Sequence, residues 1–276
     1  MWPLPQLRTE LVTIVLTPKT LTCGWIQQQK NARTFFAHTA QKQNLHTPHI
    51  HKKSATQPYI LRAYEQTPLE QLQFAQGVLY NPTCIQKYIA SFLQEHKLEN
   101  AFIALSVSGD HILQRLITLG SAMPTQEQFP LPEKKNLRWD YRYLYPNQDG
   151  TFTFYFYGLP QELLLQYKLL AIATSLNLIT ITPSWATYLQ LYKQLHGTTF
   201  SHSALAEAMN NIENIEQLIS PEQLHNYCSL TMNTVPAPLK SLYWQENNQK
   251  LTTTDSAHET AQLACMLGLF ITGNRL

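Results

Sequence analysis

Short stretches of apolar and β-branched residues in the first quarter of the chain predict strands. Residues 11–16 (LVTIVL) and 21–27 are two such stretches, and the short Thr17-Pro18 break between them favours a hairpin. Further strands are expected over residues 34–38 and 59–64. The polar residues between these two strands, 39–57, are the best loop candidate in the sequence.

The spacing of apolar residues then changes to that of a helix. Asn81-Pro82 combines a preferred N-cap residue with proline at the first helical position. Apolar residues recur from Ile85 to Leu93 at helical spacing, so one face is expected to be buried, and Asn100 is expected to end the helix. Buried strands are predicted over 101–107 and 112–119, with the turn Ser108-Gly-Asp-His111 between them.

An aromatic hairpin is predicted over residues 137–145 and 151–157, with its turn at 147–150. Alternation in the first of these strands divides its side chains between two faces. One face is expected to carry Trp139, Tyr141, Tyr143 and Tyr145, and the other Arg138, Asp140 and Arg142.

The second half of the chain is predicted to be mainly helical. A helix is expected from Pro160 to about residue 176, a strand over 177–182, and a helix from Ser184 to Gly197. Capping boxes at 220–223 and 256–259 indicate two more helices, the second running to about 271. A helix is also expected over 203–219, and a small hairpin over 239–244 and 250–253. This order of elements is that of an α/β protein with a mixed sheet.

Composition excludes several classes of protein. Only nine of 276 residues are glycine, and no two of them are separated by one residue, so a G-x-G-x-x-G dinucleotide motif is impossible. Gly268 and Gly273 have P-loop spacing, but Asn274 and Arg275 follow where Lys and Ser/Thr are required. A net charge of +2 gives no indication of nucleic-acid binding.

Cysteine usage and hydropathy point to a cytoplasmic protein. The four cysteines are widely spaced, without a C-x-x-C motif, so reduced and mostly buried thiols are expected. The N-terminus lacks the layout of a signal peptide. The longest strongly apolar stretch, 263–271, is far shorter than the roughly 20 residues that span a bilayer, so no direct membrane insertion is expected.

Three groups of residues were weighed for chemistry. His46, His49 and His51 could ligate a metal, but the loop holds no cysteine or carboxylate, which favours a solvated loop. Residues 108–111 contain Ser, Asp and His, but adjacent positions cannot form a catalytic triad. Residues 138–142 form either a binding ledge or an ordinary two-faced strand. No catalytic, cofactor-binding or metal-binding residue is therefore assigned.

The segments from residue 59 to about 195 resemble, in their order and local sequence, the PilM family, the actin-like cytoplasmic proteins of type IV pilus assembly. The segments are YILRAYEQTPL, GVLYNPTCIQKYIASFL, AFIALSVSGDHILQRLITL, LRWDYRYL and FTFYFYGLPQELLLQYKLLAIATSLNLITITPSWATYLQLYK, and ETAQLACMLGLFITG resembles the closing helix. The resemblance implies an actin-like (ribonuclease H-like) mixed sheet with a reduced second lobe. The core is expected to comprise residues 1–110 and 179–276, and 111–178 a smaller inserted α/β subdomain.

Departures from the family pattern concern nucleotide binding. Actin-like ATPases carry a D-x-G-x-x-x-S/T turn for phosphate and magnesium, and the equivalent residues 12–22 (VTIVLTPKTLT) contain neither Asp nor Gly. The second such motif should follow the helix that ends near residue 195, where no Asp occurs before Asp255. The resemblance therefore implies a pseudo-ATPase without a nucleotide cofactor.

The implied function is a non-catalytic scaffold of a type IV pilus or a related secretion or DNA-uptake complex, peripheral to the inner membrane. It would bind the short cytoplasmic N-terminal tail of a single-span, PilN-like membrane protein. Arg138, Asp140, Tyr141 and Arg142 are the candidate partner-binding residues. The alternatives are a divergent ATP-binding protein, a cytoplasmic platform component of type II secretion, and a hydrolase or transferase with a site around His111 and Asp140.

Overall fold

The computed structural model describes most of the chain up to residue 196 and the C-terminal helix. The described residues are 9–29, 59–70, 73–75, 77–98, 100–129, 136–196, 205, 209, 218–220, 223–224, 228–230 and 253–273. The predicted strand at 34–38, the histidine-containing loop, most of the hairpin at 239–253 and most of the helix at 203–219 lie outside these residues. Thr253, predicted to end that hairpin, is instead the first residue of the C-terminal helix.

The main element is a six-stranded mixed sheet in the order β10-β6-β1-β2-β3-β11. The neighbouring pairs β1–β2 and β2–β3 are antiparallel, whereas β1–β6, β6–β10 and β3–β11 are parallel. The strands are β1 (Glu10–Leu16), β2 (Thr20–Gln28), β3 (Tyr59–Pro68), β6 (Phe102–Val107), β10 (Asn177–Pro183) and β11 (Cys228–Leu230). The central strands β1 and β6 are buried almost throughout, as expected for unbroken apolar segments covered on both faces.

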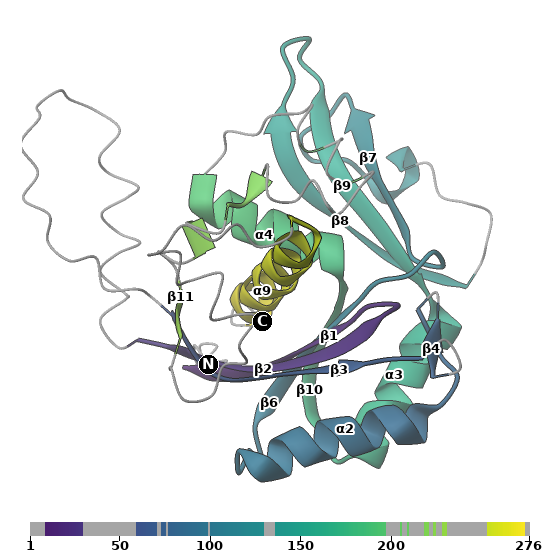
Figure 1. Ribbon diagram of the computed structural model, residues 1–276. Coiled ribbons are helices and arrows are strands. Elements are labelled where there is room, and N and C mark those ends of the chain that lie inside the picture. The colour runs from purple at the N-terminus through teal and green to yellow at the C-terminus, as the bar shows by residue number, and fades with distance from the viewer. Residues whose placement is uncertain are drawn as a thin grey trace, which may run out of the picture.

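Helices cover both faces of this sheet (Figure 1). One face packs against α2 (Pro82–Glu95) and α3 (Gln161–Ala173), the other against α4 (Ser184–His196) and α9 (Thr253–Gly273). The side chain of Asn81 accepts a hydrogen bond from the Cys84 backbone N–H at 3.1 Å, which confirms the predicted N-cap of α2. The strands β4 (Phe74–Ala75) and β5 (Val78–Leu79) form a small antiparallel pair before α2.

A second sheet of three antiparallel strands follows the order β7-β9-β8 and stands at one end of the large sheet (Figure 1). Its strands are β7 (Leu113–Leu119), β8 (Leu137–Pro146) and β9 (Phe152–Pro160), and a short 3₁₀ turn, η2 (Gln126–Gln128), precedes β8. Phe129, Phe154 and Phe156 are buried in a cluster of its own, separate from the main core. The division into a core of residues 1–110 and 179–276 and an inserted subdomain of residues 111–178 stays a prediction.

Several predicted boundaries differ from the structure. Helix α2 ends at Glu95 and not at Asn100, because Lys97 adopts a left-handed φ of 57° just after the C-cap. Helix α3 ends at Ala173, before the predicted residue 176, and Ser175 has a φ of 54°. Helix α9 begins at Thr253, so the capping box predicted at Ser256 lies inside the helix.

Tyr145 is not on the same face as the other aromatic residues of β8, which corrects the predicted alternation. The pairing with β9 passes from Tyr143↔Phe154 directly to Tyr145↔Thr153, so Leu144 is an extra residue in the strand. A bulge of this kind shifts the residues after it to the opposite face. Leu144 and Tyr145 accordingly pack into the main core.

The capping box predicted at residues 220–223 is confirmed. Ser220 Oγ accepts a hydrogen bond from Gln223 N at 3.3 Å, and Gln223 Oε1 accepts one from Ser220 N at 2.8 Å, which is the reciprocal pairing of a capping box. None of the four cysteines, all of them in the described part of the chain, forms a disulfide. In the same part of the chain, no helix has the length and apolar character needed to cross a membrane.

Candidate functional site

A groove runs along one face of β8, between the three-stranded sheet and the elements of the main core that lie opposite. It consists of three adjoining cavities of about 660, 390 and 380 Å³, here called the outer, central and inner cavities. The outer and central cavities share Arg138 and Leu164, and the central and inner cavities share Arg142 and Thr272. Because each of these cavities shares lining residues with the next along β8, the three are treated together and called the β8 groove.

Alternation along β8 places three of the four predicted site residues in this groove. Arg138, Asp140 and Arg142 all line its central cavity. Arg142 Nη1 donates a hydrogen bond to Gln190 Oε1 of α4 at 3.0 Å, and the Tyr157 hydroxyl of β9 donates one to Asp140 Oδ2 at 3.0 Å. Burial and the nearby Asp140 carboxylate raise the pKa of Tyr157, so this hydroxyl stays protonated and remains a donor at neutral pH.

Tyr141, the fourth predicted residue, lies on the opposite face of β8. Its ring centroid is 4.5 Å from that of Phe129, and Trp139 lies 5.5 Å from the same ring. The aromatic face of β8 therefore packs against its own small cluster, in agreement with the two-faced strand interpretation. The structure brings Arg138, Asp140 and Arg142 together and places Tyr141 away from them.

The opposite wall of the groove comes from elements that the sequence analysis did not connect with β8. Leu164 of α3, Thr180 and Thr182 of β10 and Thr272 of α9 line the central cavity. Lys168 of α3 lines the outer cavity, and Lys193 of α4 lines the inner cavity. No local pattern could have indicated these residues, because each owes its position to a long-range contact.

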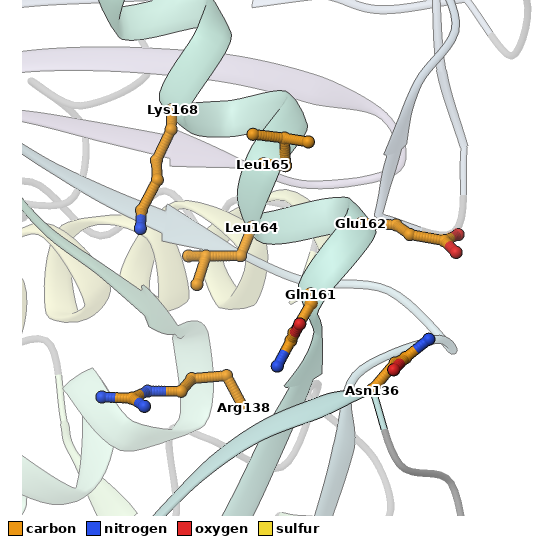
Figure 2. Close-up of a pocket in the computed structure, with 7 residues that line it drawn as sticks. All are labelled: Asn136, Arg138, Gln161, Glu162, Leu164, Leu165 and Lys168. Carbon is orange, nitrogen blue, oxygen red and sulfur yellow. The ribbon is translucent and has the colours of Figure 1, made fainter.

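The outer cavity has charged groups at both of its ends. Figure 2 shows Lys168 and Arg138 reaching from α3 and β8 to the same side of the cavity, with Leu164 between them. Glu162 and Asn136 lie at the other side in this view. Arg138 is exposed and Leu165 is 56% exposed, so this part of the groove is open to solvent.

His111 and Asp140 do not share a cavity. His111 lines a fourth cavity of about 370 Å³, which adjoins the outer cavity through Asn136 and Gln161. Asp140 does not line this cavity, and lines the central cavity instead. Among the described residues, no three His, Cys, Asp or Glu side chains gather in a group that could hold a metal ion. The convergence required by the hydrolase alternative is therefore not found for this pair.

The turn between β1 and β2 lies where the sequence resemblance predicts the first phosphate-binding turn of actin-like ATPases. Thr17 Oγ1 accepts hydrogen bonds from Thr20 N at 3.0 Å and from Lys19 N at 3.4 Å, and it lies 2.8 Å from Thr20 Oγ1. Pro18 has no N–H group. The amide groups of Thr17, Lys19 and Thr20 are thus all bonded within the turn.

Comparisons with known proteins give a result only at the level of structure. No model of a protein family matches the chain, and no curated protein matches its sequence. The solved "PilM-PilN type IV pilus biogenesis complex" is similar to 96% of this chain and 99% of that chain, with a TM-score of 0.50 and 11% identity. The cytoplasmic domain of EpsL, an inner-membrane component of the type II secretion system of Vibrio cholerae, matches 64% of this chain and 57% of that one, at a TM-score of 0.35 and 9% identity.

The arrangement of the large sheet and its covering helices is an actin-like α/β fold. Within that class, the fold is PilM-like, as the resemblance in the sequence implied. Because the identity is only 11%, the structural match shows the fold alone, and the function has to be argued from the residues of this chain.

Proposed function

We propose that this chain is a non-catalytic scaffold of a type IV pilus or a related secretion or DNA-uptake complex. It would lie in the cytoplasm, and its β8 groove would hold the short cytoplasmic N-terminal tail of a single-span, PilN-like inner-membrane protein. The PilM-like fold supports the type of complex. The row of adjoining cavities along β8 is the single observation that supports the binding role.

The groove has the features of a peptide-binding surface. Among the described strands, β8 pairs only with β9, so it is an edge strand whose second edge is available for a peptide added in extended form. Leu159, Leu164 and Ile181 alternate with polar groups in the central cavity, so a peptide would find both apolar and hydrogen-bonding contacts. An extended chain gains affinity from main-chain bonds and specificity from such pockets.

The β1–β2 turn supports the non-catalytic part of the proposal. Phosphate binding by backbone amides requires N–H groups that point toward the ligand. In this turn, Lys19 and Thr20 instead direct their N–H groups to the Thr17 hydroxyl. A nucleotide would have to break these bonds before it could form its own.

Two binding measurements test the proposal. The first is calorimetric titration with a synthetic N-terminal tail of the PilN-like protein from the same genome. We expect binding that is weakened by Arg138→Glu and unchanged by Lys87→Glu, an equal charge reversal at an exposed position of α2. Absence of tail binding to the wild-type protein would refute the binding role.

The second measurement is a titration with ATP and Mg²⁺. No binding is expected, because Asp and Gly are missing from the β1–β2 turn and its amides are already bonded. Micromolar affinity for ATP would refute the pseudo-ATPase role and support the divergent ATP-binding alternative.

A further inference from the structure

Cationic side chains outnumber acidic ones among the described residues that line the β8 groove. Its cationic residues are Arg138, Arg142, Lys168 and Lys193, and its acidic residues are Asp140 and Glu162. Asp140 already accepts two hydrogen bonds, from the Tyr157 hydroxyl and from Tyr141 N at 2.8 Å. This excess of cationic side chains among the described residues that line the groove favours an anionic occupant.

One residue that lines the central cavity has a buried hydroxyl without a hydrogen bond to any described residue. Thr182 lines this cavity, is 2% exposed, and its Oγ1 has no hydrogen-bond partner among the described residues. A buried polar atom without a partner is costly, and native proteins rarely contain one unless a ligand or a water completes it. Thr180, two residues earlier on the same strand, lines the same cavity.

We infer that the occupant of the β8 groove carries an aspartate or glutamate whose carboxylate lies in the central cavity, between Arg138 and Arg142, and accepts a hydrogen bond from Thr182. This inference rests on the proposed function and specifies the chemistry of the tail. Guanidinium groups match a carboxylate in geometry as well as in charge. The apolar side chains of Leu159 and Leu164 in the same cavity suit an acidic residue within a peptide better than a small inorganic anion.

Arg142 is held in place for this role by a contact outside β8. Its Nη1 donates to Gln190 Oε1 of α4, so one of its five N–H groups fixes the side chain across the groove. Arg138, by contrast, is exposed at the border between the outer and central cavities. One guanidinium is thus positioned in advance, and the second can close over an acidic side chain from the solvent side.

The test compares two synthetic peptides by fluorescence anisotropy. One is the N-terminal tail of the PilN-like protein from the same genome, and the other is that tail with every Asp and Glu replaced by Asn and Gln. We expect the amide peptide to bind at least tenfold more weakly, which is the loss typical of one charge-assisted hydrogen bond. The difference should shrink as salt is raised from 0.05 to 0.5 M, because salt screens charges that are open to solvent.

A variant of Thr182 separates binding from folding. Thr182→Val replaces an unbonded hydroxyl by a methyl group, so it should leave the melting temperature unchanged or raise it, and should still weaken binding of the acidic tail. The matched control is Thr13→Val, which removes a buried hydroxyl that donates to Gly24 O at 3.2 Å. The control should lower the melting temperature and leave the affinity unchanged.

The outcomes distinguish this inference from the proposed function. If neither peptide binds, the proposed function fails. If both peptides bind equally, or if a tail without an acidic residue binds, the proposed function stands and the acidic-residue inference is wrong. Unchanged affinity in Thr182→Val would show that its hydroxyl does not contact the carboxylate.

Discussion

A close contact between the helices α4 and α9 leads to a strong prediction about stability. At Gly268 of α9, a Cβ atom would lie 2.0 Å from the carbonyl oxygen of Thr187 in α4 and 2.6 Å from its carbonyl carbon. The obstacle is backbone, so no side-chain rotation can relieve it. Gly268→Ala would force the two helices apart, although alanine is otherwise the better helix former.

The expected loss follows from two opposing effects. Alanine gains about 1 kcal/mol over glycine in a helix. Ordinary contact begins near 3.4 Å, so the helices would have to separate by about 1.4 Å at this point. Overpacking of a core costs about 3 kcal/mol at the upper end of the usual range, which leaves a net loss of about 2 kcal/mol. For a chain of this size, that corresponds to a fall in melting temperature of roughly 4–8 °C.

The assay is thermal unfolding followed by circular dichroism, with Gly120→Ala as the matched control. A Cβ atom at Gly120 would meet nothing within 4 Å among the described residues, and its φ is not in the left-handed region. The control should change the melting temperature by no more than about 1–2 °C, as surface substitutions usually do. A Gly268→Ala protein as stable as the wild type would refute the close helix packing.

Three further predictions concern buried polar groups and thiols. In the native protein at pH 8, iodoacetamide should label only Cys84, since the other three thiols are buried, and mass spectrometry should find four labelled sites after denaturation. Burial raises the pKa of the Cys228 thiol from 9.0 to about 12, so the thiol loses its proton at a lower pH in the unfolded chain than in the folded one. The free energy of unfolding, measured with urea, should therefore fall as the pH rises from 9 to 12. In Cys228→Ala, it should fall less steeply. Gln262→Leu should lower the free energy of unfolding by about 2 kcal/mol or more in the same assay. Gln262 Oε1 accepts hydrogen bonds from the buried hydroxyls of Thr22 and Tyr64 at 2.7 and 3.0 Å, and leucine has no acceptor for them.

Local patterns in the sequence were sufficient for most strands and helices. Residues 11–16 and 101–107 are short apolar runs with turn residues on both sides, and both are buried strands in the structure. The end of α2 was placed too late, because a left-handed residue such as Lys97 carries no sequence signal when it is not glycine or asparagine. The bulge at Leu144 depends on the partner strand β9, so alternation in β8 alone could not reveal it.

Only the β8 side of the candidate site could be predicted from the sequence. Alternation correctly placed Arg138, Asp140 and Arg142 on a common face of β8. The same alternation put Tyr141 on the other face, so its inclusion in the candidate site followed from proximity along the chain and not from geometry. Lys193 and Thr182 lie on elements that follow β8 by dozens of residues, and only the folded chain brings them to the groove.

The hydrogen bonds of the groove and of the β1–β2 turn explain why we propose ligand binding in the groove and not in the turn. A polar site can bind a ligand only with donors that the protein does not already use. The turn uses its amides on Thr17, whereas the groove contains Thr182 Oγ1 without a bond among the described residues and two guanidinium groups with a surplus of N–H donors. A sequence without Asp or Gly in the β1–β2 turn can therefore have the PilM-like fold, because the fold depends on the buried strands, while the ligand binding that we propose depends on donors at the edge strand β8.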